Sequence, residues 1–225
     1  MINIAIDGPA GAGKSTVAKG LAKELGFIYV DTGALYRTVG LNCLRKNIVT
    51  TDPDAVSATL SEIKVELRFI DGAQKVFLND EDVSEAIRTP DASMAASHVS
   101  AIPSVREFLF DLQKDIAEKN NCIMDGRDIG TVVLPNAQVK IFMSASAEKR
   151  ADRRFKELQE KGSDATYQEV LDDIIKRDYN DSHREIAPLK PADDAVLLDT
   201  SDYNLEESVE AAKKICIEKM ENYGV

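Results

Sequence analysis

Residues 8–16 read GPAGAGKST, in which three glycines are followed by a lysine and a serine. The stretch fits the pattern G-x-x-x-x-G-K-[ST], whose glycines let main-chain N–H groups point at a phosphate chain. Lys14 would reach the β- and γ-phosphates of a nucleotide, and the Ser15 hydroxyl would join the shell of Mg²⁺. A glycine-rich turn without ligand is the alternative. The stretch follows an apolar run and opens a helical pattern, as the motif requires, so the sequence predicts nucleotide binding.

Three further stretches gather arginines or hydroxyl groups. Phosphoryl transfer between two phosphates requires positive charge that positions and neutralises both of them. A solvated helix face or an i, i+4 ion pair is the alternative for each stretch, and the phosphate-binding motif favours the first interpretation. The candidates are Thr32, Tyr36 and Arg37 in DTGALYR; Arg150, Arg153 and Arg154 in EKRADRRF; and Arg177, Asp181 and Arg184, spaced i, i+4, i+7, in KRDYNDSHR.

The stretch MDGRDIGTVV, residues 124–133, places two carboxylates around Arg127 directly after an apolar run. Open α/β sheets bind ligands at the carboxyl ends of their strands, so this spot is a candidate ligand site. Asp125 is either a strand-end acid in the second shell of Mg²⁺ or a turn acid ahead of Gly126.

The composition limits the possible classes of protein. A net charge of −11 over 225 residues disfavours binding to nucleic acid or to an anionic membrane surface. No apolar run is long enough to cross a bilayer, and we see no secretory signal, so we expect a cytoplasmic protein. Three widely spaced cysteines and two histidines indicate neither disulfides nor a zinc site, and we expect the cysteines to be buried.

Short apolar runs alternate with segments of helical spacing. Strands are predicted at 2–6, 27–31, 122–125, 138–143 and 195–199, and helices at 14–25, 104–118, 147–160, 167–182 and 205–221. This alternation is typical of an α/β fold with helices on both faces of a parallel sheet. Together with the phosphate-binding motif it predicts a P-loop NTPase fold with a central five-stranded parallel sheet.

Residues 63–79 depart from that alternation. Segments 63–69 and 75–79 alternate apolar and polar residues, which predicts an antiparallel hairpin in a small insertion. Residues 84–109 have helical spacing with breaks predicted at Pro90 and Pro103.

Seven stretches together resemble the bacterial-type cytidylate kinases, which are P-loop nucleoside monophosphate kinases. They are GPAGAGKST, DTGALYR, EAIRTP, AASHVSAIPSVRE, DGRDIGTVV, ADRRFKELQEKG and KRDYNDSHREIAPLKPADDAVLLDT, in the family's order and spacing. The resemblance implies direct in-line transfer from ATP to CMP or dCMP with Mg²⁺, in pyrimidine metabolism. It also implies a core domain of residues 1–36 and 104–225, a nucleoside monophosphate domain of residues 37–103 containing the hairpin, and a lid at 147–166.

The resemblance also implies roles for single residues. The residues implied to bind ATP are Gly8, Pro9, Ala10, Gly11, Ala12, Gly13, Lys14, Ser15, Thr16 and, in the lid, Arg153. Those implied to bind CMP are Ser97, Arg106 and Asp128 at cytosine, Arg177 and Asp181 near ribose, and Arg37, Arg127 and Arg184 at the phosphate, with Thr32 and Tyr36 lining the pocket. Lys14, Arg127, Arg153 and Arg184 form the implied catalytic set. Serine is also common in the family at the position of Thr32, and the hydroxyl is kept.

Three alternatives remain beside this interpretation: a UMP/CMP kinase of the adenylate-kinase type, a P-loop kinase for a non-nucleotide alcohol such as shikimate, and a nucleotide-binding regulator without turnover. The hairpin and the set of Ser97, Arg106 and Asp128 favour a cytidylate kinase. We expect a monomer, because no extended apolar heptads occur. Gly162 near the end of the lid helix is either a hinge or a helix C-cap.

Overall fold

A computed structural model of the chain describes residues 1–70, 72–160 and 162–221. Its internal contacts divide the chain into two compact units. Unit 1 comprises Met1 and Ile28–Cys122, and unit 2 comprises Ile2–Phe27 and Ile123–Val225.

The predicted five-stranded parallel sheet is confirmed, with strand order β2-β6-β1-β7-β8. Its strands are β1 (Asn3–Asp7), β2 (Ile28–Asp31), β6 (Cys122–Gly126), β7 (Val139–Ser144) and β8 (Val196–Asp199). In unit 2, Ile6 of β1 pairs with Ile141 of β7, and Ile141 pairs in turn with Val196 of β8. Ile4, Ile6 and Ile141 are almost fully buried, as expected for strands covered on both faces. Each of the five strands lies within one residue of its predicted bounds.

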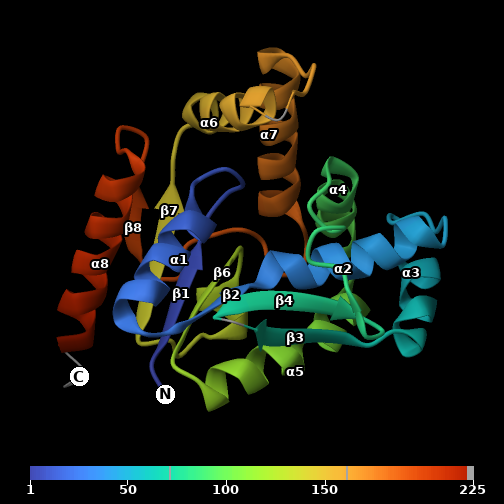
Figure 1. Cartoon of the computed structure of the whole chain (residues 1–225), viewed down its shortest axis with the longest axis horizontal. Coiled ribbons are helices and arrows are strands. Elements are labelled where there is room, and N and C mark those ends of the chain that lie inside the picture. The colour runs from blue at the N-terminus through green and yellow to red at the C-terminus, as the bar shows by residue number, and fades with distance from the viewer. Residues whose placement is uncertain (71, 161, 222–225) are drawn as a thin grey trace. The chain divides into compact units, whose positions relative to one another are not determined.

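The helices of unit 2 also match their predicted ranges. They are α1 (Lys14–Leu25), α6 (Ala147–Glu160), α7 (Tyr167–His183) and α8 (Leu205–Glu221). Helix α1 buries Val17, Leu21 and Ala22 and ends at Gly26, whose φ of +68° favours glycine. A capping box of Thr166 and Glu169 begins α7. Figure 1 shows α8 beside β8 and the start of α7 beside α6, where Phe155 and Tyr167 meet edge to face at 6.0 Å.

A short π-helical turn follows β6 in unit 2, from Ile129 to Val133, and is labelled η2. The sequence does not predict it, because five residues are too few for a helical pattern. The carbonyl of Asp128 accepts from Val132 N at 2.9 Å and from Val133 N at 3.3 Å, which closes the turn on that residue.

Unit 1 contains the predicted hairpin. Strands β3 (Val65–Ile70) and β4 (Ala73–Leu78) pair antiparallel, and the two-residue strand β5 (Glu81–Asp82) adds to β4. Alternate residues such as Val65, Val76 and Leu78 point into an apolar core.

The helices of unit 1 are only partly predicted. They are α2 (Thr32–Arg45), α3 (Pro53–Thr59), the 3-10 turn η1 (Leu60–Glu62), α4 (Pro90–Val99) and α5 (Pro103–Lys119). Pro90 and Pro103 break the helical pattern as predicted, and each begins a helix, where its missing N–H costs nothing. Residues 84–87 form a turn and residues 88–89 are not helical, contrary to the helical spacing of this segment. Helices α2 and α3 are not in the predicted set.

Aspartate side chains explain where the two additional helices begin. Asp31 caps α2 by accepting from Ala34 N at 3.0 Å, and Asp52 caps α3 by accepting from Asp54 N and Ala55 N at 3.1 Å. The apolar face of α2 then packs with Val39 and Cys43 in the core of unit 1.

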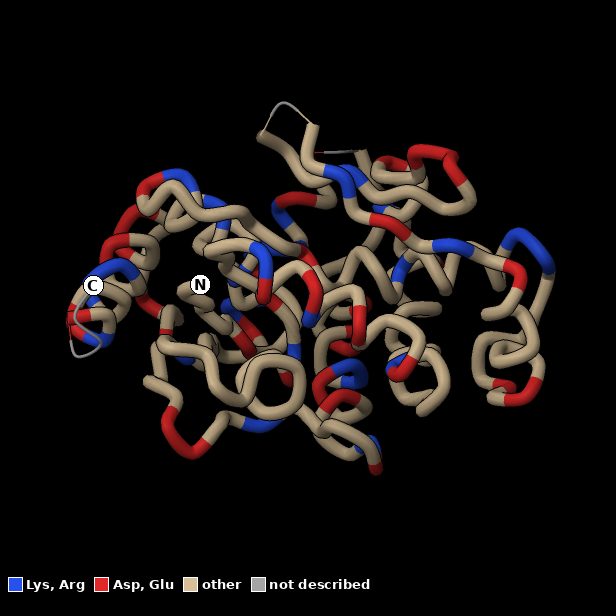
Figure 2. Tube along the Cα trace, turned by 90° about the horizontal axis from the view of Figure 1, so that it is seen from below, with Lys and Arg blue, Asp and Glu red and all other residues tan. Residues whose placement is uncertain are grey.

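The distribution of charged residues, the state of the cysteines and the apolarity of the helices can be compared with what the composition predicts. Figure 2 shows basic and acidic residues interspersed along the chain, without a continuous basic stripe among the described residues. The three cysteines are buried and free, as predicted. No described helix combines the length and apolarity that a membrane span requires.

Candidate active site

The loop between β1 and α1 has the shape of a phosphate-binding turn. Gly8 has a φ of +148°, and a Cβ there would lie 1.9 Å from the carbonyl oxygen of Met143, so no other residue fits. Gly13 has a φ of +86° and begins α1, whose free N–H groups and positive end favour an anion. The stretch predicted from the sequence, Gly8 to Thr16, therefore takes the backbone form that the motif requires.

Lys14 is buried in the first turn of α1, and its Nζ donates to the Pro9 carbonyl at 2.8 Å. The pKa of Lys14 is lowered to about 7, chiefly by burial and then by the charge of Arg127. Asp125 and Asp7 act in the opposite direction. A phosphate group beside Nζ would likewise favour the charged form, so the lysine is suited to an anionic ligand.

Ser15 and Asp125 bring a hydroxyl and a carboxylate together next to this turn. Ser15 Oγ donates to Asp125 Oδ2 at 2.6 Å, from the start of α1 to the end of β6. Of the two interpretations of Asp125, this contact agrees with the second-shell acid. Among the described residues, no group of three or more His, Cys, Asp or Glu could hold a metal by itself. A hydroxyl beside a carboxylate fits an Mg²⁺ whose remaining ligands are phosphates and water.

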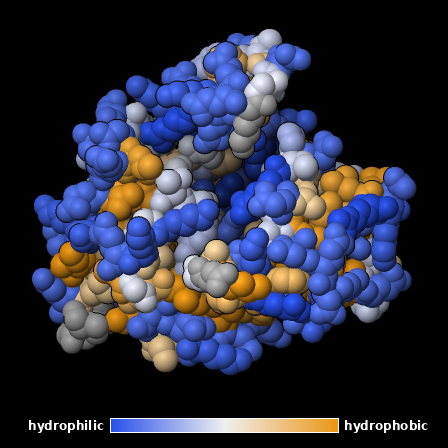
Figure 3. Space-filling model, in the orientation of Figure 1, coloured by the Kyte–Doolittle hydropathy of each residue, from blue (hydrophilic) through white to orange (hydrophobic). Residues whose placement is uncertain are grey.

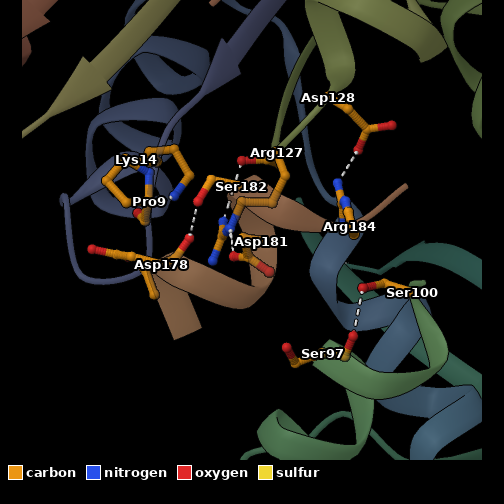
Figure 4. A network of polar contacts seen from close by, with 12 residues as sticks. Pro9, Lys14, Ser97, Ser100, Arg127, Asp128, Asp178, Asp181, Ser182 and Arg184 are labelled. Carbon is orange, nitrogen blue, oxygen red and sulfur yellow. Dashed lines mark hydrogen bonds and ion pairs between the residues drawn. The ribbon is translucent and has the colours of Figure 1, made fainter. Parts of the chain in front are cut away.

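Arg127 and Asp128 follow β6 and face α7 (Figure 4). Arg127 Nε donates to Asp181 Oδ2 at 2.7 Å, and Arg184 Nη2 lies 3.4 Å from Asp128 Oδ1. The side chains of Asp128 and Arg184 are each 6% exposed. Two predicted groups far apart in the sequence are therefore held together by charge-assisted contacts in unit 2.

The polar face of α7 carries Arg177 one turn before Asp181, as the spacing predicts. Burial, followed by the nearby charge of Arg127, lowers the pKa of Arg177. Its Nε is buried and has no hydrogen-bond partner within the described protein. Burial raises the pKa of Asp181, but the Arg127 guanidinium outweighs it, and the net pKa is lowered. A buried donor without a partner is unusual and points to a ligand acceptor.

Unit 1 holds the remaining predicted CMP residues. Arg37 Nη2 donates to Asp31 Oδ2 at 2.6 Å, and Arg88 lies 3.4 Å from the same oxygen. The Nε of Arg37, like that of Arg177, is buried without a partner in the described part of the chain. Thr32 is the first residue of α2, directly after Asp31, and is buried.

The predicted base-reading residues of unit 1 lie at the end of α4 and the start of α5. Arg106 is buried, donates to Ser100 O at 3.2 Å and lies over the ring of Tyr36 at 5.8 Å. Ser100 Oγ donates to the carbonyl of Ser97 at 3.0 Å (Figure 4). Ser97, Tyr36 and Arg106 are thus joined by a short series of contacts.

The three arginines of helix α6, which lies in the segment predicted to be a lid, make different contacts. Arg150 is buried and donates to Ala10 O at 3.0 Å in the phosphate-binding turn and to Asp178 of α7 at 2.5 Å. Arg153 donates to the carbonyl of Thr200, whereas Arg154 pairs with Glu157 at 3.1 Å near the surface. Figure 3 shows a largely hydrophilic surface over α6. Arg154 therefore forms an ion pair on a solvated helix face, at i, i+3 and not at the i, i+4 spacing given as the alternative.

Gly162 lies just after helix α6 with a φ of +73°, and its N–H donates to Gln159 O at 2.9 Å. This geometry agrees with the C-cap interpretation. Its possible action as a hinge stays a prediction.

Sequence reasoning missed four residues that support the site: Asp7, Asp31, Arg88 and Asp178. Asp7 and Asp31 each end a strand, and a strand-end acid before a glycine-rich or helical segment is a signal that could have found them. Arg88 and Asp178 carry no such signal, because their partners lie 57 and 28 residues away in the sequence.

A parallel sheet whose first strand runs into a glycine-lined turn with a buried lysine defines a P-loop nucleotide-binding fold. The chain belongs to the cytidylate kinase family, whose model matches residues 4–218. The cytidylate kinase of Caldicellulosiruptor bescii is 51% identical over 221 residues and covers 98% of both chains. That of Caldanaerobacter subterraneus is 54% identical over 209 residues, covering 93% of this chain and 92% of its own.

Two solved structures share the fold at low sequence identity. A gluconokinase from Sinorhizobium meliloti matches with a TM-score of 0.51 and 14% identity over 99% of this chain and 95% of its own. A protein of uncharacterised function from Eubacterium ventriosum matches with a TM-score of 0.51 and 16% identity over 98% of both chains. At these identities they support the fold alone.

Proposed function

We propose that this chain transfers the γ-phosphoryl group of ATP to the phosphate of CMP or dCMP, giving ADP and CDP or dCDP. The observation that carries the proposal is the arrangement around Arg127 in unit 2. One guanidinium, close enough to lower the pKa of Lys14, is bound to the helix that carries Arg177 and Asp181. Positive charge thus gathers where two phosphates would have to meet.

On the donor side, we assign residues Gly8 to Thr16 and Arg153 to ATP. The glycine-lined turn would surround the phosphates with N–H groups, and Lys14 would exchange its contact with Pro9 for phosphate oxygens. Mg²⁺ would be held by Ser15 with phosphates and water, next to Asp125. When bound, the ion neutralises charge that builds up on the phosphates.

On the acceptor side, the residues divide by chemistry. Cations and hydroxyls suited to phosphate are assigned to the CMP phosphate: Thr32, Tyr36, Arg37, Arg127 and Arg184. Arg177 and Asp181 are assigned to the ribose, where the Nε of Arg177 would find its acceptor. The boundaries proposed for these roles are residues 37–103 for the nucleoside monophosphate domain and 147–166 for the lid.

Asp128, with Ser97 and Arg106, is assigned to the cytosine. The carboxylate of Asp128 would accept from the exocyclic amine of cytosine, where uracil has a carbonyl oxygen. An unmet acceptor at a buried site costs roughly 1–3 kcal/mol, so CMP would be preferred over UMP about tenfold or more.

No general base is required, because the CMP phosphate is already largely ionised at neutral pH. Its oxygen would attack the γ-phosphorus in line, while Lys14, Arg127, Arg153 and Arg184 stabilise the charge of the transition state. Exclusion of water by the lid would prevent hydrolysis of ATP. We infer that a single chain suffices and that it works in the cytoplasm.

The test is release of ADP from ATP with CMP, dCMP, UMP, AMP or shikimate, each with Mg²⁺ or with EDTA. We expect CMP and dCMP to be the best acceptors and EDTA to abolish turnover. A faster reaction with UMP, AMP or shikimate would contradict the assignment, and ATP binding without any turnover would instead indicate a regulator. Size-exclusion chromatography in the assay buffer tests whether the protein is a monomer.

A further inference from the structure

Asp7 is a buried carboxylate that joins the phosphate-binding turn to the segment after β6. It is the last residue of β1 and directly precedes Gly8, and it is 5% exposed. Its Oδ1 accepts from Ile129 N at 2.8 Å, and its Oδ2 accepts from Gly130 N at 2.7 Å. Each oxygen therefore has its own main-chain N–H from the first turn of η2.

These two contacts fix the backbone next to Asp128. The first N–H groups of a helical turn have no partner within the turn, so a carboxylate from another strand can cap them. On its other side the Asp128 carbonyl accepts from Val132 and Val133, as described for η2. The backbone at Asp128 is thus held from both directions, and its side chain lies toward Arg184.

Gly130 shows how closely the two segments approach. A Cβ at this position would lie 3.3 Å from Asp7 Oδ2 and 3.2 Å from Cδ of Lys140. Only a residue without a side chain lets the N–H reach Asp7 without displacing one of these neighbours. Glycine at position 130 and aspartate at position 7 therefore form one matched contact.

Several charged groups surround this carboxylate. Asp128 disfavours its ionisation and Lys14 favours it. The negative charge of Asp7 favours the charged form of Arg127, and the side chain of Lys140 of β7 also approaches Gly130. A carboxylate kept at so buried a place has to be compensated, and the two N–H bonds provide most of that compensation.

We propose that Asp7 is a positioning residue that sets where the Asp128 carboxylate meets the base of the acceptor nucleotide. The inference rests on the proposed function, since it assumes that Asp128 reads cytosine. The side chain of Asp7 would then connect the ATP-binding turn, which begins at Gly8, to the residue that recognises the base of the acceptor.

Asp7→Asn is the direct test. The amide keeps the size but replaces one acceptor oxygen with an NH₂ group that faces a main-chain N–H. The ratio of kcat/KM for CMP to kcat/KM for UMP should fall about fivefold or more, the effect of losing one hydrogen bond. A general loss of structure, or an effect through Lys14, would lower both values equally and leave the ratio unchanged.

Gly130→Ala tests the same contact from its other end and is read out in the same way. Asp52→Asn is the matched control, because Asp52 also accepts two main-chain N–H bonds but lies at the exposed start of α3. It should leave the ratio as in the parent chain. Thermal unfolding of each variant shows whether it is folded.

The outcomes separate the two claims. If the parent chain does not phosphorylate CMP, the proposed function fails. If the parent prefers CMP, and folded Asp7→Asn and Gly130→Ala both keep that preference, the positioning role of Asp7 is wrong.

Discussion

Arg127 and Asp181 form an ion pair of 2.7 Å between the end of β6 and the polar face of α7. The side chain of Asp181 is 10% exposed, so the pair is shielded from water and holds the two elements in register. Arg127 also donates from Nη1 to the Gly126 carbonyl at 3.2 Å, and its charge lowers the pKa of Lys14.

Asp128→Asn should reduce the preference for CMP over UMP about tenfold while changing the KM for ATP less than twofold. The neutral amide accepts more weakly from the amine of cytosine and can turn to donate to the oxygen of uracil. Steady-state kinetics with both acceptors check this. Asp172→Asn, at an exposed position on α7, is the control. Equal losses for ATP and CMP would contradict the assignment of Asp128.

Arg177→Met should raise the KM for CMP about tenfold without lowering stability. Burial and the charge of Arg127 lower the pKa of Arg177, and the nearby carboxylates of Asp173 and Asp181 offset this only in part, so the cation is held at a net cost to folding. Removing it should leave the melting temperature unchanged or raise it by a few degrees. Lys176→Met, on the exposed neighbour, should affect neither property. A clear fall in melting temperature with an unchanged KM would assign Arg177 to the fold alone.

Arg150→Met should lower the free energy of unfolding by about 3 kcal/mol, because it leaves the carboxylate of Asp178 without its partner. It also removes a donor to Ala10 in the phosphate-binding turn, so the KM for ATP should rise. Arg154→Met is the matched change on the same helix. Its ion pair is half exposed, and the expected loss is below about 1 kcal/mol. If urea denaturation gave similar losses of unfolding free energy for Arg150→Met and Arg154→Met, the contacts of Arg150 would stabilise the fold no more than the exposed pair of Arg154.

The preference for CMP should fall as the pH drops from 7.5 to 5.5. Burial raises the pKa of Asp7 to about 6, against the two main-chain N–H bonds that lower it. Above that pH both oxygens accept, whereas protonation below it removes one acceptor and loosens the turn after Asp128. The phosphates of CMP and UMP ionise over the same pH range, so their ionisation cancels in the ratio of the two kcat/KM values. A change in that ratio therefore reports a change in the protein. The ratio in Asp7→Asn should stay low and flat, and a parallel decline in that variant would exclude Asp7 as the titrating group.

The sequence predicts the parallel sheet and its helices closely because each strand is a short apolar run and each helix has a clear apolar stripe. It does not predict α2. The helix begins in the stretch DTGALYR, which is interpreted through its polar residues, and the apolar face that includes Val39 and Cys43 is not recognised as a helical pattern. It also assigns helical spacing to residues 84–89, which form a turn and a non-helical segment ahead of Pro90.

The site is predicted where a motif has its own local backbone form, as in the turn from Gly8 to Thr16. Contacts between distant segments are not predictable in this way. Asp7 meets Ile129 across 122 residues, and nothing in either segment indicates the other. The pairing arises from the adjacent positions that the sheet gives to the ends of its strands.

The most direct test of the account is a competition in one tube. Equal concentrations of CMP and UMP, with ATP and Mg²⁺, are incubated with the protein, and the initial amounts of CDP and UDP are measured. The account predicts at least about ten CDP for each UDP, with ADP equal to their sum. A ratio near one, or ADP formed in large excess over both diphosphates, would contradict it.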